Sequence, residues 1–209
     1  MRVAPHRQFI DPNFLHSEVL YSSPHFATMR HLRYNVATTL DGFIASSSGS
    51  TRWIIEDPSI DFEKLYAEFD KFVMGRKTYE TMLAYGDQNP LKSRTKEEVV
   101  VVSRTMKEED HPELTVVRDD VVGFVRGLKK DDGKDIWLFG GGELARALLD
   151  AGLVDIVEVA VMPVLIGSGV KMVASGDGES RAWGLKVAKV ERLASGILMC
   201  KYDVGIVDR

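Results

Sequence analysis

The chain has 209 residues, of which 44% are hydrophobic and 28% are charged, so it can bury a substantial core and suits one large domain. A formal net charge of -4 leaves no basic excess, which argues against a nucleic-acid partner. The single cysteine, Cys200, excludes an internal disulfide. The absence of a long apolar run predicts a cytoplasmic protein without a membrane span or secretory signal.

The N-terminal residues differ in pattern from the rest of the chain. Prolines interrupt residues 1–30, which have no regular hydrophobic period, so we predict an extension that is partly disordered or lies on the surface. Residues 31–209 are predicted to form one domain. Within it, patterns typical of strands occur at 32–39, 41–45, 71–75, 98–103, 114–118, 135–139 and 154–162. Patterns typical of helices occur at 60–70, 76–85, 119–130 and 143–152.

The alternation of strands and helices predicts an α/β fold. The valine-rich strands are apolar on both faces, as in a mostly parallel sheet that helices cover on both sides. Residues 185–204 predict a C-terminal antiparallel hairpin that turns near Ser195 and Gly196. The long polar loop at 82–98 is a candidate for the mouth of a site.

Three consecutive glycines, Gly140, Gly141 and Gly142, join the strand at 135–139 to the next helix. The backbone N–H groups at a helix start carry partial positive charge, and the lack of β-carbons lets a phosphate approach them. Ligands of open α/β sheets bind beyond the carboxyl ends of the strands. We therefore predict phosphate binding here; the alternative is a tight turn that needs positive φ.

Two further strand ends carry anion-binding residue types. The strand at 71–75 ends in Gly75, Arg76, Lys77 and Thr78, which suits a pyrophosphate. The strand at 98–103 ends in Ser103 and Arg104, and a cation rather than an acid at this place favours the 2′-phosphate of NADP. The alternatives are a solvated first helical turn and an exposed arginine.

The motifs VATTLDGFIA, STRW, FVMGRKTYETM, VVVVSRT, IWLFGGGELARALLDAGLVD and VMPVLIGSGVKM follow one another in the chain. Their order resembles the dihydrofolate reductase-like superfamily, and most closely its branch with the reductase domain of riboflavin biosynthesis. The resemblance covers roughly residues 32–203. It implies one α/β domain with a mixed, mostly parallel central sheet, NADPH as hydride donor, a small pterin-, pyrimidine- or specialised-metabolite-like substrate, and a homodimer through sheet edges.

The resemblance also implies residue roles. The cofactor residues that it implies are Thr38, Trp53, Gly75, Arg76, Lys77, Thr78, Ser103, Arg104, Gly140, Gly141, Gly142, Glu143 and Leu144. Gly140 to Leu144 would surround the pyrophosphate and nicotinamide, and Thr38 and Trp53 would lie at the nicotinamide.

The substrate side departs from the family pattern. Dihydrofolate reductases carry a carboxylate after the tryptophan loop, and the candidates here are Glu56 and Asp57, with Thr51 as a hydroxyl donor. Asp57 precedes Pro58, which also suits a helix cap. Lys92 and Arg94 replace the arginine pattern with which riboflavin-type reductases hold a substrate phosphate.

No residues have metal-ligand spacing, so we expect no metal site. The rival to a reductase that transfers hydride to a C=N or C=O group is a non-catalytic nucleotide-binding or interaction protein on the same scaffold.

Overall fold

The computed structural model describes residues 30–176 and 181–205. The strands are β1 (Leu32–Thr39), β2 (Phe43–Ala45), β3 (Phe69–Gly75), β4 (Val99–Val102), β5 (Thr115–Val117), β6 (Asp135–Gly140), β7 (Ile156–Met162), β8 (Val170–Lys171), β9 (Gly184–Arg192) and β10 (Leu198–Gly205). The α-helices are α1 (Phe62–Ala67), α2 (Arg76–Leu83), α3 (Val121–Leu128) and α4 (Gly142–Asp150). None of these helices is long and apolar enough to cross a membrane.

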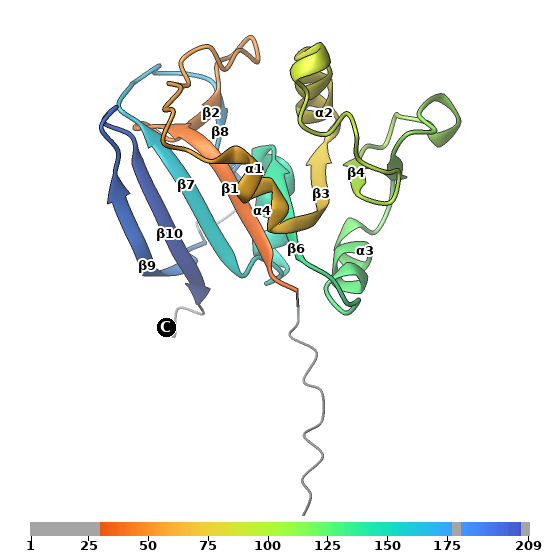
Figure 1. Ribbon diagram of the computed structural model, residues 1–209. Coiled ribbons are helices and arrows are strands. Elements are labelled where there is room, and N and C mark those ends of the chain that lie inside the picture. The colour runs from red at the N-terminus through yellow and green to blue at the C-terminus, as the bar shows by residue number, and fades with distance from the viewer. Residues whose placement is uncertain (1–29, 177–180, 206–209) are drawn as a thin grey trace, which may run out of the picture.

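Eight strands form one sheet in the order β5-β4-β3-β6-β1-β7-β10-β9 (Figure 1). β10 runs antiparallel to both of its neighbours, and the other neighbouring pairs are parallel. β2 leaves this sheet and pairs with β8 in a small antiparallel sheet. The α/β class, the mostly parallel sheet and the C-terminal hairpin are therefore confirmed.

Helices cover both faces of the parallel half of the sheet. Along β6, Ile136 and Leu138 pack into a core with α3 and α4, whereas Trp137 packs into a second core with residues of α1 and α2. Successive side chains of a strand point to opposite faces, so a strand covered on both sides is apolar at every position. This explains the valine-rich strands of the sequence.

Two local predictions needed correction. The helix expected at 60–70 ends at Ala67, because Phe69 already pairs with Asp135 as the first residue of β3. Its N-cap is Asp61, whose side chain accepts from the Lys64 amide at 2.9 Å, and not Asp57. The predicted extension 1–30 lies outside the described residues apart from Arg30, which is buried and pairs with Asp70.

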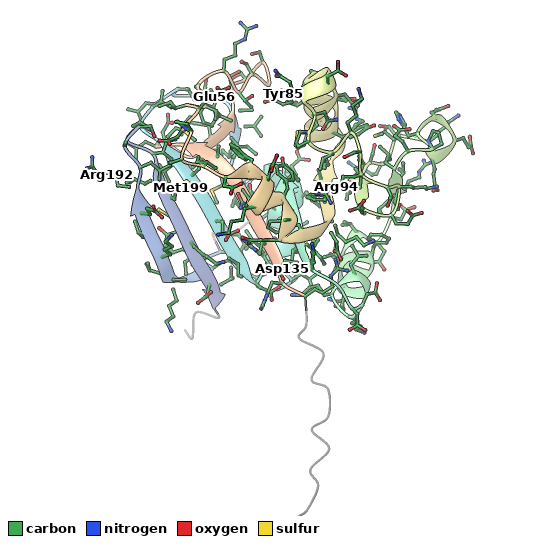
Figure 2. The ribbon with its side chains drawn as sticks, in the orientation of Figure 1. Glu56, Tyr85, Arg94, Asp135, Arg192 and Met199 are labelled. Atoms are coloured by element: carbon green, nitrogen blue, oxygen red, sulfur yellow. The ribbon has the colours of Figure 1, made fainter. Side chains whose placement is uncertain are left out.

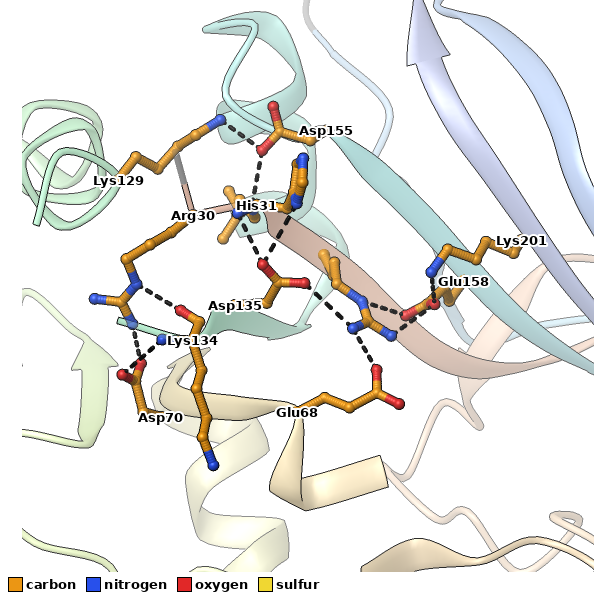
Figure 3. Close-up of polar contacts among 12 residues, drawn as sticks. Arg30, His31, Glu68, Asp70, Lys129, Lys134, Asp135, Asp155, Glu158 and Lys201 are labelled. Atoms are coloured by element: carbon orange, nitrogen blue, oxygen red, sulfur yellow. Dashed lines mark hydrogen bonds and ion pairs between the residues drawn. The ribbon is translucent and has the colours of Figure 1, made fainter. Parts of the chain in front are cut away.

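A group of ion pairs holds the amino ends of the central strands together (Figure 3). Arg33 on β1 is buried and donates to both carboxylate oxygens of Glu158 on β7, at 2.9 and 2.7 Å, and to Glu68 at 2.6 Å. Burial opposes its charge, but the hydrogen bonds to Glu68 and Glu158 raise the pKa of Arg33. These ion pairs therefore hold the amino ends of the strands in place, and the carboxyl ends remain open to a ligand.

Candidate functional site

A cleft of about 1980 Å³ lies across the carboxyl ends of the parallel strands. β4, β3 and β6 are neighbours, and their ends coincide: Gly75 pairs with Val102, and Met74 pairs with Gly140. Figure 2 labels Glu56, Tyr85 and Met199, which border the cleft from three separate segments. Small-ligand pockets usually measure roughly 300 to 1000 Å³, so the cleft has room for a dinucleotide and a second molecule.

The two helices that follow β3 and β6 begin in the cleft without a side-chain cap. Gly75 and Gly141 are the N-cap residues of α2 and α4, and neither provides a side chain for the first amides. In contrast, α1 and α3 are capped by Asp61 and Asp120. The first amides of a helix need a partner, and here both sets of free donors face one cleft. A negatively charged ligand would satisfy them.

The three glycines at the start of α4 have different physical causes. Gly140 has a φ of +100°, which fits the alternative of a turn that needs positive φ. A β-carbon on Gly142 would lie 2.2 Å from the Lys171 carbonyl oxygen, so this residue lets β8 approach. Gly141 has an extended backbone, and its β-carbon would meet only Ile44 Cδ1, at 3.9 Å. Gly141 is therefore the glycine that leaves room for a ligand.

Cations border the same end of the cleft. Arg76 and Lys77 occupy the first turn of α2, where the helix dipole favours acids rather than cations. Arg104 follows β4, and Arg118 follows the adjacent β5 and donates to the Arg104 carbonyl oxygen at 3.0 Å. The sequence did not mark Arg118 as a cofactor residue, although it follows a strand end just as Arg104 does. An anion would neutralise this cluster.

Most of the predicted site residues border this one cleft. They are Thr51, Glu56, Asp57, Gly75, Arg76, Lys77, Thr78, Ser103, Arg104, Gly141, Gly142, Glu143 and Leu144. Thr38, Trp53 and Gly140 do not. Thr38 is buried, with its hydroxyl donating to the Phe43 carbonyl at 3.1 Å, and Gly140 packs against Tyr34. The loop predicted at the mouth contributes Met82, Tyr85, Gln88 and Pro90.

Hydrogen bonds hold the Asp57 carboxylate in place. Its carboxylate accepts from the Ser59 amide at 2.9 Å and hydroxyl at 2.6 Å, and from the Ser195 amide at 3.4 Å. Hydrogen bonding from Ser195 and then Ser59 lowers the pKa of Asp57 to about 2. Asp57 is therefore ionised at neutral pH and joins its loop to the β9–β10 turn.

Other acids and hydroxyls are better placed to supply a proton. Glu56 is exposed at the cleft. The Thr51 hydroxyl lies 3.4 Å from the Tyr85 hydroxyl, so the two form a pair at the mouth. Tyr79 lies outside the cleft and donates to Glu113 at 2.7 Å, and burial raises its pKa. These contacts favour Glu56, Thr51 and Tyr85 over Asp57 and Tyr79.

The part of the cleft away from the glycines is largely apolar. Trp137 and Phe139 of β6 stack with ring centres 4.5 Å apart, and Tyr66 of α1 lies 4.8 Å from Trp137. Burial raises the pKa of Tyr66 to about 12, so its hydroxyl stays neutral. Sequence reasoning missed these residues, because an aromatic residue at a core-like position gives no sign that it faces a ligand.

Comparison with known proteins finds similar sequences and similar folds. A family model described as the RibD C-terminal domain matches residues 30–199. The uncharacterized protein YyaP of Bacillus subtilis (strain 168) is 32% identical over 181 residues, which cover 83% of this chain and 94% of that protein. A solved protein from Shewanella sp. PV-4, named for riboflavin biosynthesis, is 25% identical with a TM-score of 0.70, over 85% of this chain and 100% of that one. Dihydrofolate reductase from Enterococcus faecalis, solved with NADP(H), shares the fold at 16% identity and a TM-score of 0.56, over 83% of this chain and 94% of that one.

Proposed function

Since the chain belongs to the family of RibD C-terminal domains, we propose that it is an NADPH-dependent reductase. It transfers a hydride to a C=N or C=O group of a small substrate. The family assignment supports a reductase, and the residues of the cleft support the cofactor and the place of the reaction.

The observation that carries this proposal is the pair of uncapped helix starts in one cleft. A β-carbon on Gly75 would lie 3.8 Å from both the Gly140 oxygen and the Gly141 nitrogen, so the two helix starts are neighbours. Amides at the starts of α2 and α4 would hold the pyrophosphate, with Arg76, Lys77 and Thr78 beside them. Ser103, Arg104 and Arg118 at the ends of β4 and β5 would hold the 2′-phosphate.

The chain's own residues position the reactants and exclude water. NADPH supplies the hydride when bound, so the protein has to align two rings and deliver a proton. Ala37, Ala160 and Met162 form the floor of the cleft, and the small side chains of Ala37 and Ala160 would let a planar ring lie flat. Glu56, or the Thr51 and Tyr85 hydroxyls, would deliver the proton from the mouth.

The proposal is tested by titrating the pure protein with NADPH and then with NADH in a calorimeter. We expect NADPH to bind at least about tenfold more tightly, because only NADPH carries the 2′-phosphate that Arg104 and Arg118 would meet. The NADPH complex is then mixed with dihydropterins, ribosylaminopyrimidines, imines and enones while absorbance at 340 nm is followed. Equal binding of the two nucleotides, or no binding, contradicts the cofactor assignment.

One observation favours a non-catalytic nucleotide-binding protein as the second candidate. Asp57, one of the candidate acids, accepts hydrogen bonds from Ser59 and Ser195, and these lower its pKa to about 2. NADPH binding without oxidation by any member of the panel would favour this candidate. Turnover that falls about a hundredfold in Glu56→Gln, as loss of a general acid does, would exclude it.

A further inference from the structure

We propose that the substrate of this reductase is a planar, uncharged molecule that carries no phosphate and that presents an N–H donor to Asn35. The inference rests on the proposed function, because it concerns the half of the cleft beyond the nicotinamide. It is carried by the distribution of charge in the cleft and by the contacts of one amide side chain.

Four of the five cations that border the cleft lie at one end, since Arg76, Lys77, Arg104 and Arg118 follow β3, β4 and β5. The fifth, Lys171, lies on β8 beside Gly142 and donates to the Ser175 hydroxyl at 3.0 Å. Along the other half, from the loop after β2 across to α1 and β10, the lining side chains of the described residues include no lysine or arginine. The charges there are the carboxylates of Glu56 and Asp57. A phosphate in this half would meet repulsion and no counter-charge.

The two cations that the sequence offered for a substrate phosphate are occupied elsewhere. Arg94 donates to Glu98 at 3.0 Å and lies 4.8 Å above the ring of Phe72, behind the cleft wall. Lys92 pairs with Asp87 on the surface. Neither side chain borders the cleft. The substrate half therefore differs in chemistry from a site that holds a phosphoribosyl group.

The walls of this half suit a flat apolar body. Ile54, Ile55 and Phe62 border the cleft and remain substantially exposed, with 37%, 37% and 56% of their surface accessible. Tyr66 and the Trp137–Phe139 stack form the facing aromatic wall. Exposed apolar side chains that converge on one cavity indicate that an apolar ligand covers them.

Asn35 on β1 is the polar group at the inner end of this half, and its orientation is fixed. Its Nδ2 donates to Glu158 Oε2 at 3.1 Å, and the same carboxylate accepts from Arg33 and Lys201. The reversed amide would place Oδ1 against the carboxylate and repel it, so the network sets the orientation. No residue in the described ranges 30–176 and 181–205 donates to Asn35 Oδ1, which makes this oxygen an acceptor for a ligand N–H.

The first test uses two pairs of ligands that differ only in a phosphate, riboflavin with FMN and 7,8-dihydroneopterin with its monophosphate. Binding is measured by fluorescence, with and without saturating NADP⁺. We expect the uncharged member of each pair to bind at least about tenfold more tightly, because a phosphate would lie near acids without a cation. Tighter or equal binding of the phosphate ester overturns the proposal, as does failure of both members to bind. Failure of NADP⁺ alone instead contradicts the proposed function, because the measurement without cofactor still reports on the substrate half.

Variants test the preference for a ligand without phosphate and the role of Asn35 separately. Met199→Lys adds a cation to the apolar floor and should shift the FMN to riboflavin affinity ratio by about tenfold toward FMN. Leu165→Lys adds the same charge on an exposed loop outside the cleft and should leave the ratio unchanged. Asn35→Leu should weaken lumiflavin but not 3-methyllumiflavin, which lacks the N–H. Equal losses for both flavins would contradict the role of Asn35.

Discussion

An added methyl group should have different effects at Gly142 and Gly141. At Gly142 it should lower the stability of the fold, and at Gly141 it should weaken NADPH binding. In Gly142→Ala the new β-carbon would lie 2.2 Å from the Lys171 oxygen and 3.1 Å from the Ala174 nitrogen. Ordinary contact begins near 3.4 Å, so backbone has to move by about 1 Å, and overpacking of this kind costs about 1 to 3 kcal/mol. The shift would also disturb the hydrogen bond from Ala174 to the Gly142 carbonyl. We expect unfolding free energy to fall by about 3 kcal/mol.

Gly141→Ala is the matched control for stability and the perturbation for binding. Its φ of -73° and ψ of -167° suit any residue, and the methyl would meet only Ile44 at 3.9 Å. The free energy of unfolding should change by less than about 1 kcal/mol, because two effects oppose each other. Alanine is a weaker N-cap than glycine, but it also reduces the conformational entropy of the unfolded chain. NADPH should bind about tenfold more weakly, or about 1.4 kcal/mol, because the methyl covers the amides of α4. Urea unfolding and NADPH titration of both variants decide the matter. A Gly142→Ala protein as stable as the parent would contradict the close approach of β8, and unchanged NADPH affinity in Gly141→Ala would contradict a ligand at the α4 amides.

Four further changes test other parts of the account. Arg118→Ala should weaken NADPH binding about tenfold and leave NADH binding unchanged. Equal losses of affinity for NADPH and NADH in calorimetry would contradict a contact with the 2′-phosphate. Asp57→Asn should lower stability at pH 7. Hydrogen bonds from Ser195 and Ser59 lower the pKa of Asp57 from 3.8 to about 2, so its contribution is present above pH 3.8 and is lost as the pH falls through about 2. Urea midpoints that differ from the parent's equally at pH 7 and pH 2 would exclude this role. Tyr34→Phe removes the 2.6 Å hydrogen bond to the Met172 carbonyl and should cost about 1 to 3 kcal/mol in thermal unfolding, whereas an unchanged midpoint would show that the β8 wall is held by other contacts. The homodimer remains a prediction: Val187 on edge strand β9 is 59% exposed, and Val187→Glu should lower the dimer fraction in sedimentation unless that edge is not the interface.

The sequence predicted the fold and the cleft well where a residue pattern has a single structural explanation. The valine-rich strands predicted a sheet covered on both sides, and the glycines and cations at three strand ends predicted one cleft, because parallel strands end at the same edge. The bounds of α1 were not predictable from its period. Phe62, Leu65, Tyr66 and Phe69 fit one helical face, yet pairing with β6 draws Phe69 into β3. Tertiary pairing overrides local pattern in such cases.

The substrate half was not predictable for a related reason. Asn35, Trp137 and Met199 come from three strands that are far apart in the sequence, and nothing in the local sequence marks the face on which each one lies. The role of Asp57 was hard to predict for another reason. An acid that precedes a proline suits both a proton donor and a structural cap. The contacts of Asp57 with Ser59 and the distant Ser195 favour the structural role.

In the proposed function, the free amides at the starts of α2 and α4 together hold the phosphates of one dinucleotide. Backbone amide NMR of the protein during titration with NADPH tests it most directly. We expect large shifts at Arg76, Lys77 and Thr78, together with Gly141 to Leu144, and small shifts at Val125 to Leu128 at the far end of α3, which do not border the cleft. Shifts confined to one of the two helices, or equally large shifts at Val125 to Leu128, would contradict it.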